Sequence, residues 1–119
     1  AHFDGRDTTF DLALMGMGDD GHTLSLFPGT PVINEAEAWT SAFFLPEQDM
    51  YRLTVTAPLV NRSAAVAFLV AGNTKARALR EVLKGDYQPD LYPSQVIKPV
   101  DGNLHWFIDE AAAGMLDTH

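Results

Sequence analysis

The sequence predicts an α/β domain of the layered, Rossmann-like kind, in which a mostly parallel sheet is flanked by helices. Two observations favour this class. Short apolar runs typical of strands alternate along the chain with segments of helical spacing. The first apolar run also ends in a glycine-rich segment, as strands do at the ligand-binding edge of such sheets. With 119 residues, 46% of them hydrophobic, we expect a single domain over residues 1–119.

Five segments are expected to form strands of this sheet. Phe10–Met15 is a nearly unbroken apolar run, which predicts a strand buried on both faces. Ala65–Ala71 is the longest such run, and Gly72 ends it. The other three expected strands combine β-branched or aromatic residues with alternating polarity, and they are Trp39–Leu45, Arg52–Thr56 and Leu104–Ile108.

One clear helix is expected after the apolar run that ends at Gly72. Asn73 or Thr74 can cap it, its apolar residues keep helical spacing, and Gly85 is expected to stop it. A second helix is expected to start at Asp109 and to run to about Leu116. The remaining segments are a polar lead-in at residues 1–9, a short helical turn at 58–63, and an element of undecided type at 93–97, between two prolines.

The composition indicates which binding partners and which cellular location to expect. The net charge of −8 argues against nucleic acid, since phosphate backbones require clustered Lys and Arg. No apolar stretch is long enough to span a membrane, so no membrane partner is expected. The chain has no cysteine, which fits a reducing compartment, and we expect a cytoplasmic protein. A small anionic substrate remains compatible if local Lys and Arg residues receive it.

The segment from Gly16 to Pro28, called the glycine loop below, carries the strongest indication of function. Its glycines let the backbone turn tightly and approach a ligand closely. Asp19, Asp20 and His22 lie near its start, beyond the carboxyl end of the first expected strand. A histidine with an acid two residues earlier suits proton transfer near neutral pH. We therefore expect a catalytic His22, against the simpler interpretation of a loop histidine that only bonds a carbonyl.

The glycines also allow a nucleotide-binding interpretation, which the context does not favour. Gly16, Gly18 and Gly21 match the spacing of a dinucleotide fingerprint. His22 follows where a run of helix formers is expected, and no acidic residue ends a second strand about twenty residues on. The other histidines and acids have no trusted metal-ligand spacing, so no metal site is predicted.

Two cations are candidates for binding an anion. Lys75 lies in the first turn of the expected helix, where the helix dipole disfavours a cation unless an anion compensates it. Arg52 opens a strand after a turn, where it can either reach over the end of a sheet or lie solvated at a strand end. Phosphate is the obvious anion, although no P-loop spacing is present.

These residues together resemble the 6-phosphogluconolactonase family. The glycine loop matches in Gly16-x-Gly-x-Asp-Gly-His-Thr-x-Ser-Leu-Phe-Pro28, with Leu24 where the family usually has a small residue. The resemblance continues, in the family's order, through the segments Arg52-Leu-Thr-Val-Thr56, Val70-Ala-Gly-x-x-Lys-Ala76 and Leu104-x-Trp-x-x-Asp-x-Ala-Ala112. It therefore covers nearly the whole chain.

The resemblance implies hydrolysis of 6-phospho-D-glucono-1,5-lactone to 6-phosphogluconate in the pentose phosphate pathway, without metal or cofactor. It implies that His22 is the general base, that Asp20 belongs to the same catalytic loop, and that Arg52 and Lys75 hold the phosphate. Gly18 and Gly21 would line the substrate site. Family members are about twice as long, so the chain corresponds to their C-terminal half and lacks their N-terminal phosphate loop.

Two alternatives remain open at this point. Glucosamine-6-phosphate deaminases have a related loop, but theirs continues with an acid that residues 23–28 lack. A non-catalytic sugar-phosphate-binding fragment is the other alternative. In either case, the strands missing from the sheet would leave an open edge and an apolar patch, and we expect self-association through them.

Overall fold

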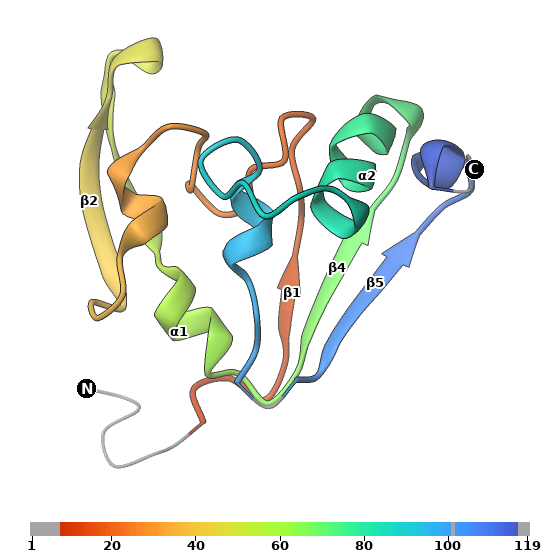
Figure 1. Ribbon diagram of the computed structural model, residues 1–119. Coiled ribbons are helices and arrows are strands. Elements are labelled where there is room, and N and C mark those ends of the chain that lie inside the picture. Colours follow the sequence, from red (N-terminus) through yellow and green to blue (C-terminus); the bar gives the residue numbers. More distant parts are fainter. Residues whose placement is uncertain (1–7, 101, 117–119) are drawn as a thin grey trace.

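The computed structural model describes residues 8–100 and 102–116 and contains a parallel sheet and a separate hairpin. β1 (Ala13–Met15), β4 (Val66–Val70) and β5 (Leu104–Ile108) form the sheet, with β4 in the middle and all pairings parallel. β2 (Thr40–Leu45) and β3 (Met50–Val55) pair antiparallel and stand apart from the sheet (Figure 1). The predicted α/β class with a mostly parallel sheet is confirmed.

Helices connect these strands. α1 (Ala57–Asn61) follows β3, with Pro58 in its first turn, where a missing N–H costs nothing. α2 (Ala76–Lys84) follows β4 and ends at Gly85, whose N–H donates to the Glu81 carbonyl, as the sequence predicts. Short 3-10 helices occupy Pro31–Asn34, Pro46–Gln48, Asn73–Lys75, Pro93–Val96 and Ala112–Met115.

The main core lies between one face of the sheet and the helices. Alternate strand residues point toward α1 and α2, and the Phe68 ring, fully buried in β4, stacks on Trp106 of β5 with ring centroids 4.1 Å apart. Leu79 of α2 is fully buried in the same core. A smaller cluster joins Leu26 of the glycine loop to Val32 and Ile33 of the 3-10 helix that follows it. This packing fixes the carboxyl ends of the strands, where the candidate site lies.

The opposite face of the sheet is not covered by the described residues, which corrects the prediction for residues 10–15. Only Ala13–Met15 forms a strand, and it is an outer strand rather than one buried on both faces. Leu14, Leu69 and Phe107 point away from α2 and are 54–64% exposed. The apolar run in the sequence therefore indicates residues able to be buried, not residues that are buried here.

The segments 39–45 and 52–56 are strands, but they do not belong to the parallel sheet. They pair with each other, Thr40 opposite Val55 and Leu45 opposite Met50, around a tight turn at residues 46–49. Asp49 takes a positive φ of 48° in that turn. Strands this close in sequence pair antiparallel, because a parallel pairing needs a long crossover connection.

Three local predictions are corrected. The helix after Gly72 starts at Ala76 rather than at residue 73 or 74, and neither Asn73 nor Thr74 makes a capping hydrogen bond with its side chain. The segment 109–116 forms a 3-10 turn over Ala112–Met115, because its last N–H groups bond three residues back. The undecided segment at 93–97 is also a 3-10 turn. The predicted lead-in at residues 1–9 falls largely outside the described residues.

Candidate active site

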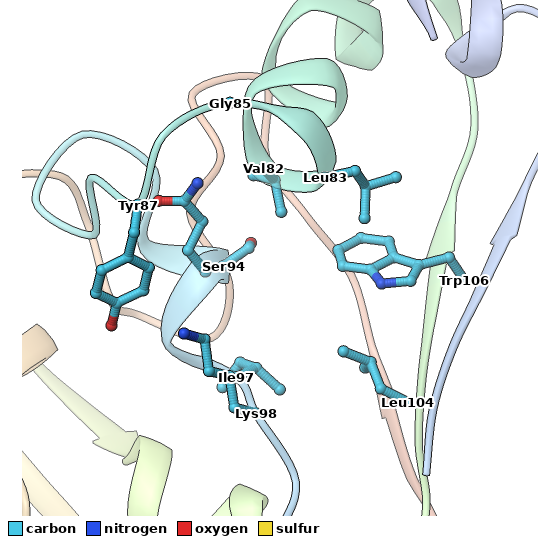
Figure 2. A pocket seen from close by; sticks show the side chains of 10 residues that line it. Val82, Leu83, Gly85, Tyr87, Ser94, Ile97, Lys98, Leu104 and Trp106 are labelled. Atoms are coloured by element: carbon cyan, nitrogen blue, oxygen red, sulfur yellow. The ribbon is translucent and has the colours of Figure 1, made fainter. Parts of the chain in front are cut away.

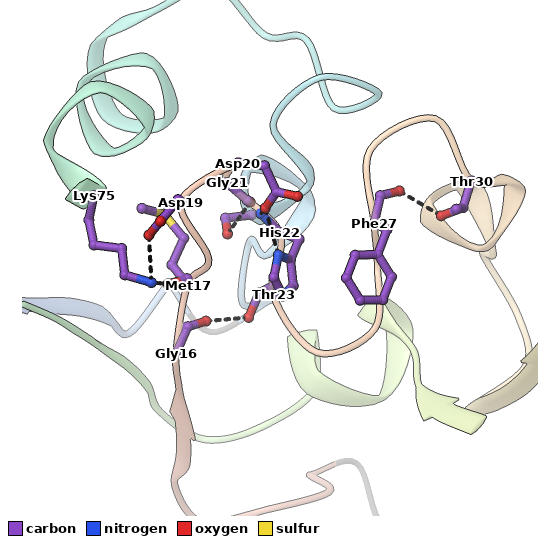
Figure 3. Close-up of polar contacts among 11 residues, drawn as sticks. Gly16, Met17, Asp19, Asp20, Gly21, His22, Thr23, Phe27, Thr30 and Lys75 are labelled. Atoms are coloured by element: carbon purple, nitrogen blue, oxygen red, sulfur yellow. Dashed lines mark hydrogen bonds and ion pairs between the residues drawn. The ribbon is translucent and has the colours of Figure 1, made fainter. Parts of the chain in front are cut away.

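The glycine loop follows β1 and closes on itself through its own backbone. The Gly18 N–H donates to the His22 carbonyl at 2.8 Å, and the Gly21 N–H donates to the Gly18 carbonyl at 3.0 Å. The buried Thr23 hydroxyl donates to the Gly16 carbonyl at 2.7 Å, which ties the far side of the turn to the end of the strand (Figure 3). The loop therefore presents Asp20 and His22 on a turn whose geometry is fixed from within.

Asp20 and His22 form a direct pair. The Asp20 carboxylate lies 2.6 Å from Nδ1 of the His22 ring, and the same oxygen accepts the His22 backbone N–H at 3.0 Å. Partial burial opposes ionisation of Asp20, but the hydrogen bonds from the His22 ring and backbone outweigh it and lower the pKa of the carboxyl. An ionised carboxylate only accepts, so the ring proton resides on Nδ1. Nε2, which has no partner within the described residues, is then the nitrogen able to take a proton.

Both predicted glycines of the site are required by space or by backbone conformation. A Cβ on Gly18 would lie 2.2 Å from the His22 ring, so the imidazole packs directly on this glycine. Gly21 has a φ of +84°, and a Cβ there would approach Tyr92 at 3.1 Å. Gly16, by contrast, has no atom within 4 Å of such a Cβ. Close approach at Gly18 and a left-handed backbone at Gly21 therefore shape the turn.

Leu24, two residues after His22, is a strained position. Its φ of 56° lies in the left-handed region, which a branched side chain seldom adopts. The Leu24 side chain packs against both the main core and the smaller cluster. This packing offsets the strain and holds the end of the turn.

A segment more than seventy residues away also holds the turn, and no sequence pattern indicates this contact. Ser94, buried in the 3-10 turn Pro93–Val96, donates both its N–H and its hydroxyl to the Gly21 carbonyl, at 2.9 and 2.7 Å. Gln95 in turn bonds the backbone around the end of α2. The prolines flanking residues 94–97 showed only that the segment is irregular, because a contact this distant leaves no local pattern.

Lys75 reaches the glycine loop, where it is already engaged by two groups of the chain. Its Nζ donates to the Met17 carbonyl at 2.8 Å and pairs with Asp19 Oδ1 at 3.1 Å (Figure 3). Lys75 precedes α2 rather than lying within its first turn. The negative partner that its position indicated is therefore present within the chain, as Asp19.

Arg52 contacts the end of the glycine loop, at Phe27. Its guanidinium carbon is 5.5 Å from the centroid of the Phe27 ring, and that ring lies 4.6 Å from the His22 ring. The buried Nε of Arg52 has no hydrogen-bond partner among the described residues. Both cations therefore contact the glycine loop, Lys75 near its start at Met17 and Asp19 and Arg52 near its end at Phe27.

A hollow of about 390 Å³ opens beside the turn, and its lining includes Gly18, His22 and Lys75. Another hollow, of about 260 Å³, lies between the end of α2, the turn at 93–96 and β5 (Figure 2). Its lining contains Trp106 and the Lys98 ammonium, which is 4.1 Å from the Tyr87 ring centroid, but no carboxylate or imidazole. Of these two hollows, the one beside the glycine loop contains the imidazole of His22.

Within residues 8–100 and 102–116, no group of three or more histidines and acids is arranged to hold a metal ion. In the same part of the chain, no helix is long and apolar enough to cross a membrane.

Comparison with known proteins places this arrangement in a family. A family model described as glucosamine-6-phosphate isomerases/6-phosphogluconolactonase matches residues 1–106. A 6-phosphogluconolactonase of Synechocystis sp. is 44% identical over 108 residues, which are 91% of this chain and 44% of that protein. The human 6-phosphogluconolactonase is 39% identical over 108 residues, 90% of this chain and 42% of that protein. The chain belongs to the glucosamine-6-phosphate isomerase/6-phosphogluconolactonase family.

Solved structures give the same result for the fold. The 6-phosphogluconolactonase of Trypanosoma brucei superposes with a TM-score of 0.76 at 26% identity, covering 90% of this chain and 42% of that one. A monomeric glucosamine-6-phosphate deaminase gives 0.72 at 25% identity, with 88% and 47% covered. The chain thus spans less than half the length of the relatives it matches.

Proposed function

We propose that this chain carries the proton-transfer part of a 6-phosphogluconolactonase site, which hydrolyses 6-phospho-D-glucono-1,5-lactone to 6-phosphogluconate in the pentose phosphate pathway. The observation that carries the proposal is the 2.6 Å contact between Asp20 and Nδ1 of His22, which leaves Nε2 as the basic nitrogen. The names of the relatives from Synechocystis and human support the reaction class. Such hydrolysis needs neither metal nor cofactor, because a lactone is an activated ester.

The proposed reaction has two proton transfers. His22 Nε2 takes a proton from water while the water oxygen bonds to the lactone carbonyl carbon, giving a tetrahedral oxyanion. The bond between that carbon and the ring oxygen then breaks, and the protonated His22 returns the proton to the ring oxygen. Asp20, ionised and fixed on Nδ1, orients the imidazole and stabilises its positive charge between the two steps.

Lys75 and Arg52 are proposed to bind the substrate phosphate. Lys75 shares a hollow with His22, so a ligand held by its ammonium lies in reach of the imidazole. Arg52, with an unbonded buried Nε, has donors to offer a ligand on the hairpin side of Phe27. Holding the phosphate positions the distant carbonyl for attack.

Two other functions compete with this one. The likeness to a monomeric glucosamine-6-phosphate deaminase favours an aldose–ketose isomerisation with release of ammonia. The absence of a carboxylate at residues 23–28 counts against it. Sugar-phosphate binding without catalysis is the second competitor, since the chain spans less than half of its relatives.

A chimera tests these functions directly. This chain replaces its matched segment in the Synechocystis relative, and 6-phosphogluconate formation is measured above spontaneous lactone hydrolysis. We expect turnover in the chimera, and little or none in the isolated 119-residue chain. Ammonia release from glucosamine 6-phosphate would support the deaminase instead, and binding of 6-phosphogluconate without turnover would support the binding fragment.

We also propose that isolated copies of the chain associate, through the uncovered sheet face and the open edge of β1. Leu14, Leu69 and Phe107 form an exposed apolar face there, which favours contact with another surface. Light scattering after size exclusion should give a mass above that of one chain. Leu69→Thr should lower that mass, whereas Leu53→Thr, in the hairpin and 82% exposed, should not.

The cytoplasmic location expected from the sequence stays a prediction.

A further inference from the structure

We propose that Asp19 is an internal competitor for the anion that Lys75 binds, so that it sets how tightly the site takes a phosphate. The inference rests on the proposed function, because it deepens the role of Lys75. It starts from the two contacts of the Lys75 ammonium, the Met17 carbonyl at 2.8 Å and the Asp19 carboxylate at 3.1 Å.

These two contacts differ in kind. The Met17 carbonyl belongs to the backbone of the glycine loop, directly after β1, and it fixes the direction in which the ammonium points. Asp19 is a side chain that is 63% exposed, whereas the Lys75 side chain is only 26% exposed. One contact is therefore fixed, and the other can rotate away into solvent.

The Asp19 carboxylate balances the charge of Lys75 when no anion is bound. A charged side chain that is only 26% exposed, as that of Lys75 is, lacks part of its hydration, and the nearby Asp19 carboxylate supplies a counter-charge. A phosphate that bonds the same ammonium brings its negative oxygens close to this carboxylate. If Asp19 stayed there, it would repel the anion, since both are negative. Binding therefore includes the displacement of Asp19.

Such a competitor lowers apparent affinity by the fraction of chains in which Lys75 is free. Asp19→Asn keeps the size of the side chain and removes its charge. It should therefore tighten binding of inorganic phosphate and of 6-phosphogluconate to the 119-residue chain by about three- to tenfold. The gain should shrink at high ionic strength, because salt screens an exposed carboxylate.

Calorimetry with inorganic phosphate and with 6-phosphogluconate provides the test. Asp86→Asn is the matched control, because it removes the same charge from an exposed aspartate beyond the far end of α2. Lys75→Ala is the second comparison, and the gain from Asp19→Asn should disappear in the Lys75→Ala background. Tighter binding in Asp19→Asn alone, with Asp86→Asn unchanged, supports the inference.

Three results would overturn it, and they are distinguishable. If Lys75→Ala weakens binding but Asp19→Asn leaves it unchanged or weakens it, Asp19 orients Lys75 rather than competing with its ligand, and the proposed phosphate role survives. If Lys75→Ala binds like the unmodified chain, the phosphate role of Lys75 fails, and this inference fails with it. Equal gains in Asp19→Asn and Asp86→Asn would show a general charge effect and would also overturn it.

Discussion

Two aspartates follow parallel strands of the same sheet and bond backbone N–H groups, yet they serve different purposes. Asp20, in the loop after β1, accepts the His22 N–H and the His22 ring. Asp109, directly after β5, accepts the N–H groups of Ala112 at 2.8 Å and of Gly72 at 3.1 Å, which joins the ends of β5 and β4. Both carboxyls have a lowered pKa. A lowered pKa alone therefore does not distinguish the two aspartates; what differs is that Asp20 has a titratable partner, the His22 ring.

The largest effect on catalysis is expected from the residue paired with Asp20. His22→Ala in the chimera should lower kcat by roughly two to four orders of magnitude, the usual range for a general base. Substrate binding should survive, because the phosphate contacts remain. Steady-state kinetics with the phosphorylated lactone measure both. A variant with nearly normal kcat would remove His22 from the mechanism.

Gly18→Ala tests whether the position of the imidazole matters beyond its presence. The added methyl would lie 2.2 Å from the ring, so His22 must move. A displacement of about 1 Å can cost about a hundredfold in rate, and we expect a fall in kcat of that order. Gly16→Ala is the matched control, since nothing lies near its Cβ. Equal losses in both variants would contradict the positioning argument.

Loss of the proposed phosphate contacts should have a smaller effect, and it should change KM more than kcat. Lys75→Ala and Arg52→Ala should each raise KM for the phosphorylated lactone roughly tenfold or more, because charge-assisted hydrogen bonds contribute in both ground and transition states. kcat should change less. Hydrolysis of the unphosphorylated lactone serves as the control and should barely change. Equal losses on both substrates would assign these residues to the fold instead.

Asp109→Asn should have the smallest effect on catalysis and a measurable one on acid stability. The hydrogen bonds from Ala112 and Gly72 lower the pKa of Asp109 below its ordinary 3.8. The folded state therefore binds this proton less readily than the unfolded state, so the contribution to stability is present above about pH 4 and is lost as the pH falls through the lowered value. Urea unfolding at pH 7 and pH 3 should show a smaller pH dependence in Asp109→Asn. An unchanged pH dependence would contradict this.

The sequence predicts the parts of this molecule that depend on neighbouring residues. The proximity of Asp20 to His22, the turn at the glycines around them and the end of α2 at Gly85 follow from local chemistry, and the structure has these features. The roles proposed for the site residues remain predictions.

The parts that the sequence did not predict depend on distant contacts. The hairpin alternates in polarity like a sheet strand, so only its pairing in space shows that it stands apart. The exposure of Leu14 depends on what covers the sheet. Ser94 bonds Gly21 across more than seventy residues, and the Asp19–Lys75 pair spans more than fifty. No periodicity or motif encodes such pairs.

The packing of Leu24 determines whether the glycine loop can unfold locally. Its side chain packs on the main core and on the smaller cluster of Leu26, Val32 and Ile33, so the two clusters share it. The loop that carries His22 is thereby joined to the cooperative unit of the sheet, and it should not fray alone as surface loops do. Amide hydrogens of this turn, such as that of Gly18, should exchange with solvent nearly as slowly as those of β4. Leu24→Ala should uncouple them and speed exchange in the turn first.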